Sequence, residues 1–212
     1  EVLYKSYMAW GPECLQKFNG MFAFAIYDTF KKEVFLARDI AGEKPLYFTD
    51  SPFRFASEAK ALGYKCTEFP KAHYAIWDLR KNKWKGPFKE YWKLEPRKIN
   101  LREAEEELEW LIEDSVKLRT RSDVPYALYY SGGVDSSLLA TYHDFKYKLT
   151  YKDKEHTASE FKRDFPRILH YLDGPVSSFS PFGLYDLARV AKSRGIKVVL
   201  SGEGADELFG GY

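Results

Sequence analysis

The feature that most constrains the fold is a pair of short apolar segments, each followed at once by a loop that contains glycine. Residues 125–130 run into Ser131-Gly132-Gly133, and residues 196–200 run into Ser201-Gly202-Glu203-Gly204. A strand, a glycine loop and then a helix form the opening unit of a parallel sheet, and in open α/β sheets ligands bind at the carboxyl ends of the strands. The sequence therefore predicts an α/β parallel-sheet domain with a binding site where both strands end.

The first 95 residues show a different pattern. Short apolar runs bounded by polar turns predict strands at 21–27, 33–38, 45–48 and 53–56, and a hairpin formed by 73–79 and 86–92. A helix is predicted at 2–10, ending at Gly11-Pro12. Aromatic residues make up 17% of the chain, which favours pleated, half-buried strands. We predict two domains, 1–95 with an α+β, antiparallel β-rich fold and 96–212 with the α/β fold.

The second domain begins after a linker at 95–98 with a predicted amphipathic helix at 101–118. Its apolar face is expected to consist of Leu101, Ala104, Leu108, Leu111, Ile112 and Val116. A strand is predicted at 145–151 and a helix at 184–194, which Gly195 closes. A parallel sheet of 125–130, 145–151 and 196–200 alone would be thin and would have exposed edges.

Composition excludes several classes of protein. The net charge of +2 gives no general attraction to nucleic acid or anionic membranes, and the basic residues Lys117, Arg119 and Arg121 are interpreted as a solvated helix end. Cys14 and Cys66 have no CxxC spacing, which argues against a zinc site or a disulfide framework. No apolar run approaches the roughly 20 residues that span a bilayer, and residues 1–5 do not resemble a signal peptide. We therefore expect a cytoplasmic protein.

The string SGGVDSS at 131–137 has the chemistry of a phosphate-binding loop. Glycines let backbone N–H groups approach an anion closely, and Ser136 and Ser137 start the next helix, where hydroxyls are expected to point toward a phosphate. Asp135 would be repelled by that phosphate unless a divalent cation lay between them, so Mg²⁺ is implied. The alternative is a plain turn and helix cap, which the position of the whole string after a strand makes a weaker interpretation.

The second loop, SGEGADELFGGY at 201–212, places three carboxylates at the start of a helix: Glu203, Asp206 and Glu207. Burying that much negative charge without a cation would cost on the order of several kcal/mol. We therefore expect these side chains to face a cation rather than the core.

The first string resembles the PP-motif of the ATP pyrophosphatase superfamily, and the second resembles the signature of the asparagine synthetase family. The resemblance implies ATP and Mg²⁺ as cofactors, with Asp135 and Asp206 as ligands of the metal. Glu203 and Asp206 would be catalytic, Glu203 by handling a proton of the attacking ammonia. Glu207 is expected to support the helix start. The residues implied to contact the nucleotide are Tyr129, Ser131, Gly132, Gly133, Asp135, Ser136, Ser137, Ser201 and Gly202.

The implied reaction converts aspartate, through β-aspartyl-AMP, to asparagine with ammonia from glutamine, and releases AMP and pyrophosphate. Three alternatives stay open. A related synthetase of the β-lactam-forming or peptide-cyclising type would adenylate a different carboxylate. A non-catalytic remnant would bind nucleotide or merely support a partner, although it would have no need for Asp135, Glu203 and Asp206. A PP-loop enzyme that modifies tRNA is disfavoured because there is no basic stripe.

The first domain resembles the later strands of a class II glutamine amidotransferase, which implies an Ntn-hydrolase-like fold. The resemblance lies in residues 21–28, 38–47 and 55–62, where Arg38 and Asp39 are interpreted as framework rather than catalytic residues. In that family an N-terminal cysteine hydrolyses glutamine. The sequence begins with Glu1, and the internal Cys14 and Cys66 have no α-amine of their own to act as base.

Two further departures from the family pattern concern length. The short helix expected at 135–144 meets the strand expected at 145–151 with almost no connection, whereas the family has a further strand and helix there. The sequence also ends at Tyr212, where the family continues with a helical region that supplies a catalytic lysine. We therefore interpret the sequence as parts of a longer glutamine-dependent enzyme. Its oligomeric state is left open, a homodimer included.

Overall fold

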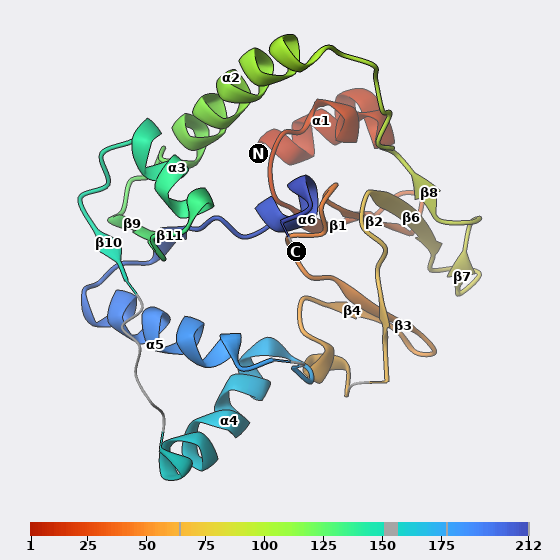
Figure 1. The fold of residues 1–212 in the computed structure, drawn as a ribbon. Helices are drawn as coiled ribbons and strands as arrows, with labels where there is room; N and C mark the ends of the chain where they lie inside the picture. Colours follow the sequence, from red (N-terminus) through yellow and green to blue (C-terminus); the bar gives the residue numbers. More distant parts are fainter. Residues whose placement is uncertain (64, 151–156, 177, 212) are drawn as a thin grey trace. The chain divides into compact units, whose positions relative to one another are not determined.

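The computed structural model describes residues 1–63, 65–150, 157–176 and 178–211, and the chain divides into two compact units, Glu1–Pro96 and Arg97–Tyr212 (Figure 1). The elements of unit 1 are α1 (Val2–Trp10), the 3-10 helix η1 (Gly11–Lys17), β1 (Ala23–Asp28), β2 (Glu33–Arg38), β3 (Tyr47–Asp50), β4 (Phe53–Ala56), the 3-10 helix η2 (Ala59–Leu62), β5 (Thr67–Glu68), β6 (His73–Asp78), β7 (Lys83–Trp84) and β8 (Lys89–Glu90). The elements of unit 2 are α2 (Leu101–Arg119), β9 (Tyr126–Tyr129), α3 (Val134–Tyr142), β10 (Lys148–Leu149), α4 (Ala158–Leu172), α5 (Ser180–Ser193), β11 (Val198–Leu200) and α6 (Ala205–Phe209).

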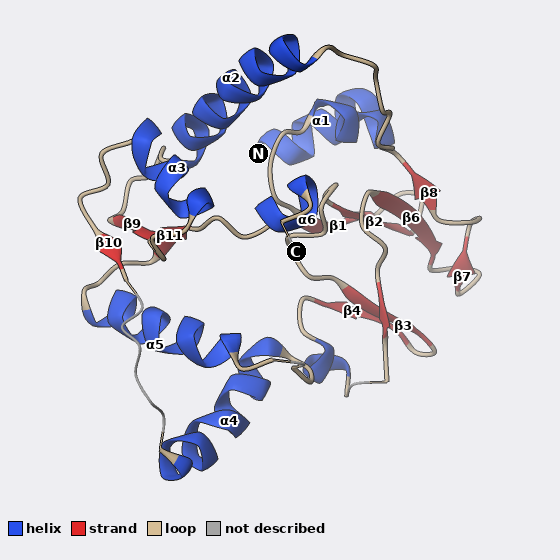
Figure 2. Cartoon of the chain, viewed as in Figure 1, coloured by secondary structure: helices blue, strands red, loops and turns tan. Residues whose placement is uncertain are grey.

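Unit 1 is built on antiparallel strands, as predicted. One sheet has the order β1-β2-β6-β7, with β8 also paired to β6 (Figure 2). The other has the order β4-β3-β5. Two turns of this unit are closed in the same way. The Asp28 carboxylate accepts the N–H groups of Phe30 and Lys31. The Asp78 carboxylate accepts those of Arg80 and Lys81 in the same way. Aspartate side chains that bond to the backbone in this way stabilise tight turns.

The predicted hairpin of 73–79 with 86–92 is wrong in its second strand. The strand that follows the turn is β7, which pairs Trp84 with Trp77, and β8 pairs separately with the start of β6. Gly86 and Pro87 lie between the two, and proline has no N–H to donate to a ladder. The pairing is therefore interrupted where a single strand was expected.

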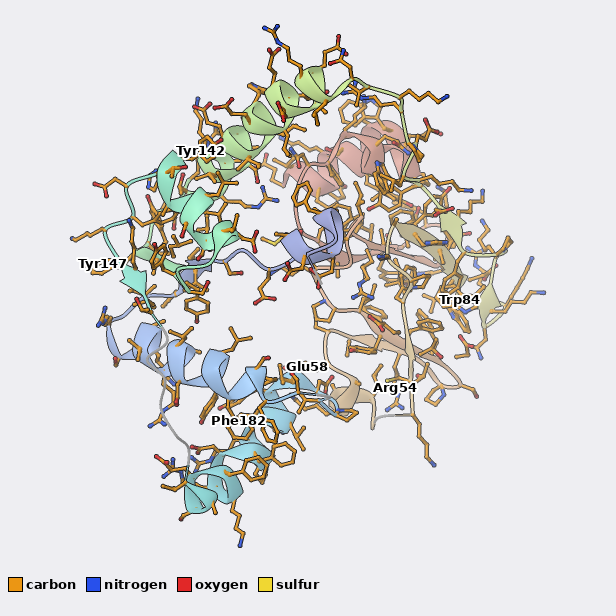
Figure 3. The ribbon with its side chains drawn as sticks, viewed as in Figure 1. Arg54, Glu58, Trp84, Tyr142, Tyr147 and Phe182 are labelled. Atoms are coloured by element: carbon orange, nitrogen blue, oxygen red, sulfur yellow. The ribbon has the colours of Figure 1, made fainter. Side chains whose placement is uncertain are left out.

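The core of unit 1 lies on both faces of β2, because successive side chains of a strand point to opposite sides. Val34 and Leu36 belong to one apolar cluster, with Phe48, Phe69 and Trp77 among its members. The neighbouring residues Phe35 and Ala37 belong to a second cluster, to which η1 contributes Cys14 and Leu15 and which Tyr91 completes. Trp84, labelled in Figure 3, packs edge-on against the ring of Trp77, and the two ring centroids are 5.0 Å apart.

Unit 2 contains the predicted thin parallel sheet, in the order β10-β9-β11. The central strand β9 carries Ala127 and Leu128, both fully buried. Gly195 adopts a left-handed conformation just after α5, and the N–H of Ile196 donates to the carbonyl of Ala191 at 2.9 Å, which ends the helix and directs the chain into β11. Tyr151, the end of the predicted strand at 145–151, and Tyr212, the end of the second string, lie outside the described residues.

The helix predicted at 101–118 is present as α2, but its apolar face is only partly covered. Val116 is buried and Ile112 half-buried, whereas Leu101 and Leu111 are 76% and 47% exposed. The predicted helix is therefore confirmed, and its apolar face is covered mainly around Ile112 and Val116. Periodicity shows which residues share a face, but it does not show how much of that face another element covers.

Helix α4 was not predicted from the sequence, although it has 15 residues. The Thr157 hydroxyl accepts the N–H of Glu160, and the Glu160 carboxylate accepts the N–H of Thr157, so a capping box marks its start. Phe182 of α5 stacks on Phe161 and Phe165 of α4, with ring centroids 5.1 and 6.1 Å apart (Figure 3). Within the described ranges, no helix has both the length and the apolar content needed to cross a membrane.

Candidate functional site

The candidate site lies in unit 2, where β9 and β11 end. The two strands are parallel neighbours, with Val198 opposite Tyr126 and Leu200 opposite Leu128, so their carboxyl ends meet at one edge of the sheet. A cavity of about 210 Å³ lies at this edge. Its lining consists of Tyr129, Tyr130, Ser131, Asp135, Ser136, Leu184, Leu187, Ser201, Gly202, Glu203, Gly204, Asp206 and Glu207.

The structure brings most of the predicted site residues to this cavity. Tyr129 and residues of both strings line it together, although the first string ends at Ser137 and the second begins at Ser201. The predicted residues in the lining are Tyr129, Ser131, Asp135, Ser136, Ser201, Gly202, Glu203 and Asp206. Gly132, Gly133 and Ser137 belong to the first string but are outside that lining.

Sequence reasoning missed two leucines and a tyrosine in the lining. Leu184 and Leu187 come from α5, and Tyr130 directly follows Tyr129 at the end of β9. The two leucines lie three residues apart on the helix that precedes β11, which places them on one helix face. That spacing could have identified them as an apolar wall beside the loop of β11.

The two loops touch where Gly202 meets Asp135. A Cβ atom at position 202 would lie 2.8 Å from the Cβ of Asp135, which is closer than real Cβ atoms approach, and in ordinary contact, at 3.5 Å, with the backbone nitrogen of Ser136. The glycine at 202 is therefore required by the packing of one loop against the other. At Gly211 an added Cβ would overlap only the end of the Asp206 side chain, which could turn away.

The first loop turns through Gly132, whose φ of +81° is a conformation that glycine adopts without strain. Helix α3 then begins without a side-chain cap. Ser136 is buried and its hydroxyl bonds to Ser131 and Gly133, and the Ser137 hydroxyl donates to the Tyr130 hydroxyl at 3.3 Å. The two serine hydroxyls therefore bond to the protein, whereas the sequence suggested that they point toward a phosphate.

The three carboxylates proposed for catalysis and metal binding are the least constrained charges of the site. Asp135 and Asp206 are half-buried and Glu203 is exposed, and none of the three side chains has a hydrogen bond or ion pair with another described residue. In the described part of the chain, no three His, Cys, Asp or Glu side chains form a ready-made metal site.

Mg²⁺ is usually held by one or two carboxylates together with substrate phosphates and water, so a pair such as Asp135 and Asp206 fits that ion. The cavity is smaller than the range of about 300–1,000 Å³ typical of sites that enclose a whole small-molecule ligand. It therefore suits part of a nucleotide, such as its phosphates. Burial raises the pKa of Tyr129, which keeps its hydroxyl protonated beside such a ligand.

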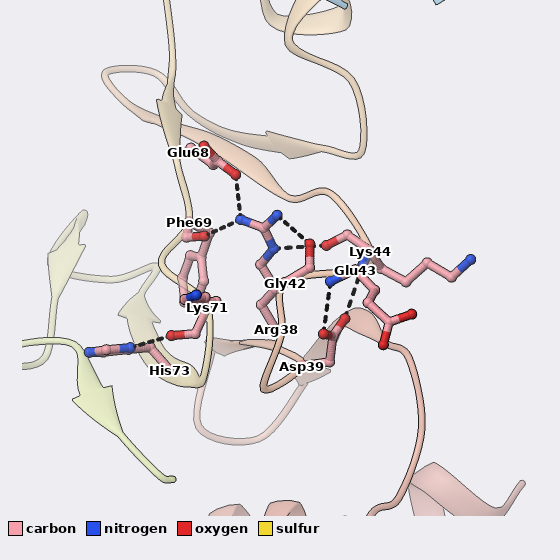
Figure 4. A network of polar contacts seen from close by, with 9 residues as sticks. All are labelled: Arg38, Asp39, Gly42, Glu43, Lys44, Glu68, Phe69, Lys71 and His73. Carbon is pink, nitrogen blue, oxygen red and sulfur yellow. Dashed lines mark hydrogen bonds and ion pairs between the residues drawn. The ribbon is translucent and has the colours of Figure 1, made fainter. Parts of the chain in front are cut away.

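Unit 1 holds a second concentration of polar groups around Arg38 and Asp39 (Figure 4). The Arg38 guanidinium donates to the carbonyls of Gly42, Lys44 and Phe69 at 2.7 to 2.8 Å and pairs with Glu68 at 2.7 Å. The Asp39 carboxylate accepts N–H groups of Phe22, Glu43 and Lys44. Both side chains are nearly inaccessible to water, which agrees with the interpretation of the pair as framework.

The two cysteines of unit 1 are poor candidates for a nucleophile. Cys14 is fully buried, and burial raises the pKa of its thiol, which disfavours the reactive thiolate. Cys66 is half-buried, with its sulfur 4.0 Å from the carbonyl oxygen of Ala59.

Comparison with known families divides the chain close to its structural boundary. Residues 1–107 match the model of a glutamine amidotransferase domain. Residues 107–152 and 146–212 match the model of asparagine synthase, in two pieces that overlap at 146–152.

Curated relatives align along the whole chain. A putative asparagine synthetase (glutamine-hydrolyzing) of Methanocaldococcus jannaschii is 32% identical over 277 positions, which include 100% of this chain and 53% of the relative. Asparagine synthetase B of Escherichia coli is 30% identical, with 100% and 47% covered, and an asparagine synthetase of Bacillus subtilis is 30% identical, with 100% and 43% covered. The chain spans about half the length of the curated relatives it matches.

Proposed function

The chain belongs to the asparagine synthetase family, and we propose that its protein uses ATP to convert a carboxylate into an amide. In the first step an oxygen of the aspartate side-chain carboxylate attacks the α-phosphorus of ATP, and the bond to the β-phosphate oxygen breaks. This gives β-aspartyl-AMP and pyrophosphate. In the second step ammonia, drawn from glutamine, attacks the acyl carbon, AMP leaves, and asparagine forms.

The observation that carries this proposal is the meeting of the two loops at one cavity, where Gly202 lies against Asp135. The contact holds the carboxylates of two distant sequence segments at the ends of adjacent strands. Asp135 and Asp206 would hold Mg²⁺, which neutralises charge on the departing pyrophosphate. Phosphoryl-transfer sites depend mainly on such positioning and charge neutralisation.

Glu203 is proposed to take the proton that the attacking nitrogen must lose. Its carboxylate is exposed at the cavity and has no partner among the described residues, so it is free to accept a proton. A general base needs hydrogen-bond reach to the reacting group, and a position on the cavity wall beside Asp206 favours that.

A second candidate is a synthetase that activates an acid other than aspartate. None of the described residues that line the cavity is basic, so the α-carboxylate of aspartate finds no lysine, arginine or histidine partner in that lining. A carboxylic acid without a second negative charge would fit such a wall at least as well.

The test is pyrophosphate release by the full-length protein with Mg²⁺ and ATP, in the presence of aspartate or a panel of other carboxylic acids. Mass spectrometry of the product with glutamine or ammonium chloride then identifies the amide. Aspartate-dependent release together with asparagine supports the first proposal, and release with another acid alone supports the second. Binding of ATP without pyrophosphate release from any acid would reject both and favour a nucleotide-binding remnant.

A further inference from the structure

Unit 1 contains a cavity of its own, at one end of the sheet β4-β3-β5. Its volume of about 520 Å³ lies within the range of about 300–1,000 Å³ that is typical of sites for small molecules. The lining comes from the end of β3, the turn into β4, and the segment between η2 and β5. Pairing of β3 with β5 ends where Phe48 lies opposite Thr67, so the cavity lies where this ladder stops.

Two cations of this lining have no partner in the protein. Arg54 of β4, labelled in Figure 3, and Lys65 are both exposed, and neither has a hydrogen bond or ion pair with another described residue. Asp50 is the one acid among the described residues of the lining, and its carboxylate already accepts the indole N–H of Trp84 at 2.9 Å. The described lining therefore has a net positive charge, and its two cations are open to an anion.

Arg38 shows how this fold treats an arginine that serves the structure. Its guanidinium donates to three backbone carbonyls and pairs with Glu68, so its donors are used within unit 1. A guanidinium has five N–H donors in a planar fork that matches a carboxylate or a phosphate. The fork of Arg54 is unused and stands beside a cavity of ligand size, which makes it available to such a group.

We propose that this cavity binds a small organic anion, a carboxylate or a phosphate ester, whose charged group pairs with Arg54 and Lys65. Phe48 and Leu62 are buried members of the lining, so they form its floor, and the carbon part of the ligand lies against them. Arg54 fixes the orientation of the anion through paired donors, and Lys65 adds a compact charge. The site lies wholly in unit 1 and does not depend on the amide-forming reaction proposed for unit 2.

Cys66 is a natural reporter for this site, because its half-buried thiol is part of the lining. The test measures how fast iodoacetamide alkylates Cys66 in the full-length protein, by mass spectrometry of the peptide that contains it. Succinate and benzoate are the carboxylate probes, and glycerol 3-phosphate is the phosphate probe. Succinamide is the uncharged counterpart of succinate. Cys14 is fully buried and reports any loss of the fold.

The variants are Arg54→Ala and, as a matched control, Lys83→Ala. Lys83 is an exposed cation of β7 without a described partner, and it is outside the lining, so its loss changes the charge of unit 1 equally. Arg54→Lys keeps the charge but removes the paired donors. Because Arg54 has no partner within the described chain, its replacement is expected to leave the midpoint of thermal unfolding unchanged.

At about 10 mM, at least one of the three anions is expected to slow alkylation of Cys66 about twofold or more, and succinamide is not. Arg54→Ala should raise the concentration needed for half protection about tenfold or more, Arg54→Lys less, and Lys83→Ala not at all. Protection by carboxylates alone, or by the phosphate alone, supports the proposal and identifies the anion.

Three results would overturn the proposal: no protection by any of the anions, equal protection by succinamide, or the same loss of protection in Arg54→Ala and Lys83→Ala. If Cys66 proves unreactive toward iodoacetamide, calorimetry of the same probes with the wild type and Arg54→Ala replaces the alkylation rate. Equal Kd values for the two proteins would then reject the site.

Discussion

Asp39 of unit 1 and the two aspartates at the cavity of unit 2 differ in how the fold treats their charge. In unit 1 the Asp39 carboxylate is buried and accepts three backbone N–H groups, so its charge is satisfied within the fold. In unit 2 the Asp135 and Asp206 carboxylates line a cavity without a hydrogen bond or ion pair to another described residue. A charge that the fold satisfies serves the structure, and a charge left without a partner at a cavity is available to a ligand.

The sharpest way to break this comparison is Asp39→Ala. Three N–H groups would lose their acceptor in a buried place, and each such loss costs about 1–3 kcal/mol, so the free energy of unfolding of unit 1 should fall by about 3–5 kcal/mol. Urea unfolding followed by tryptophan fluorescence measures it, since Trp77 and Trp84 lie in the core of this unit. Glu43→Ala, at an exposed position beside Asp39, is the control and should stay within about 0.5 kcal/mol. A loss below 1 kcal/mol for Asp39→Ala would contradict the framework role.

Asp206→Asn should show the reverse behaviour. The amide keeps the shape of the side chain but removes the charge, so stability should change by less than about 0.5 kcal/mol, while pyrophosphate release should fall about a hundredfold or more. Asp123→Asn is a matched control on an exposed loop of the same unit and should leave the rate unchanged. If Asp206→Asn lowered stability and activity in parallel, the Asp206 carboxylate would stabilise the fold, as that of Asp39 does, rather than serve a ligand.

Gly202→Ala sharpens the comparison at the contact between the loops. The added methyl group would meet the Cβ of Asp135 at 2.8 Å, so one loop must shift, at a cost of about 1–3 kcal/mol. The displaced carboxylate should reduce pyrophosphate release about tenfold. Gly174→Ala, where the added atom has open space, should behave as the wild type in both assays. Equal rates for the two variants would show that the contact is not needed for activity.

The smallest effect concerns acid stability. The pKa of Asp28 lies below the usual value of 3.8, mainly because its carboxylate accepts the backbone N–H of Lys31. The pKa of Asp78 is lowered in the same way by the N–H of Lys81. A lowered pKa in the folded state means that these carboxylates stabilise unit 1 above pH 3.8 and lose that contribution as the pH falls through the folded pKa. Urea unfolding between pH 6 and pH 2.5 should therefore show a shallower decline for the pair of variants Asp28→Asn and Asp78→Asn. An unchanged decline would assign the acid sensitivity to other groups.

Much of the fold could be predicted because its signals are local. The bounds of β2 and of helices α1 and α2 follow from periodicity and from turn residues, and the parallel sheet follows from two strands that end in glycine loops. Helix α4 was missed because Pro166 lies inside it, although Thr157 and Glu160 form a recognisable capping box. The exposure of Leu101 and Leu111 on α2 could not be predicted, because burial depends on which other elements pack against the helix, and periodicity does not show that.

The site shows the same division. Two strands that end in glycine loops predicted one binding site, and the resemblance to the family assigned Asp135, Gly202 and Asp206 to it. The structure brings all three residues to one cavity. The direction of the Ser136 hydroxyl was not predictable, because serine at a helix start can bond either to a ligand or back to its own loop. Only the structure shows the second of these, through the bonds to Ser131 and Gly133.

The contact between Gly202 and Asp135 also restricts which changes this sequence can accumulate. A residue larger than glycine at position 202 would meet the Cβ atom of residue 135 at 2.8 Å. Only glycine at position 135 would remove that atom, and it would also remove a carboxylate from the cavity. The residue that fits at position 202 therefore depends on the residue at position 135, although more than 60 positions separate them in the chain.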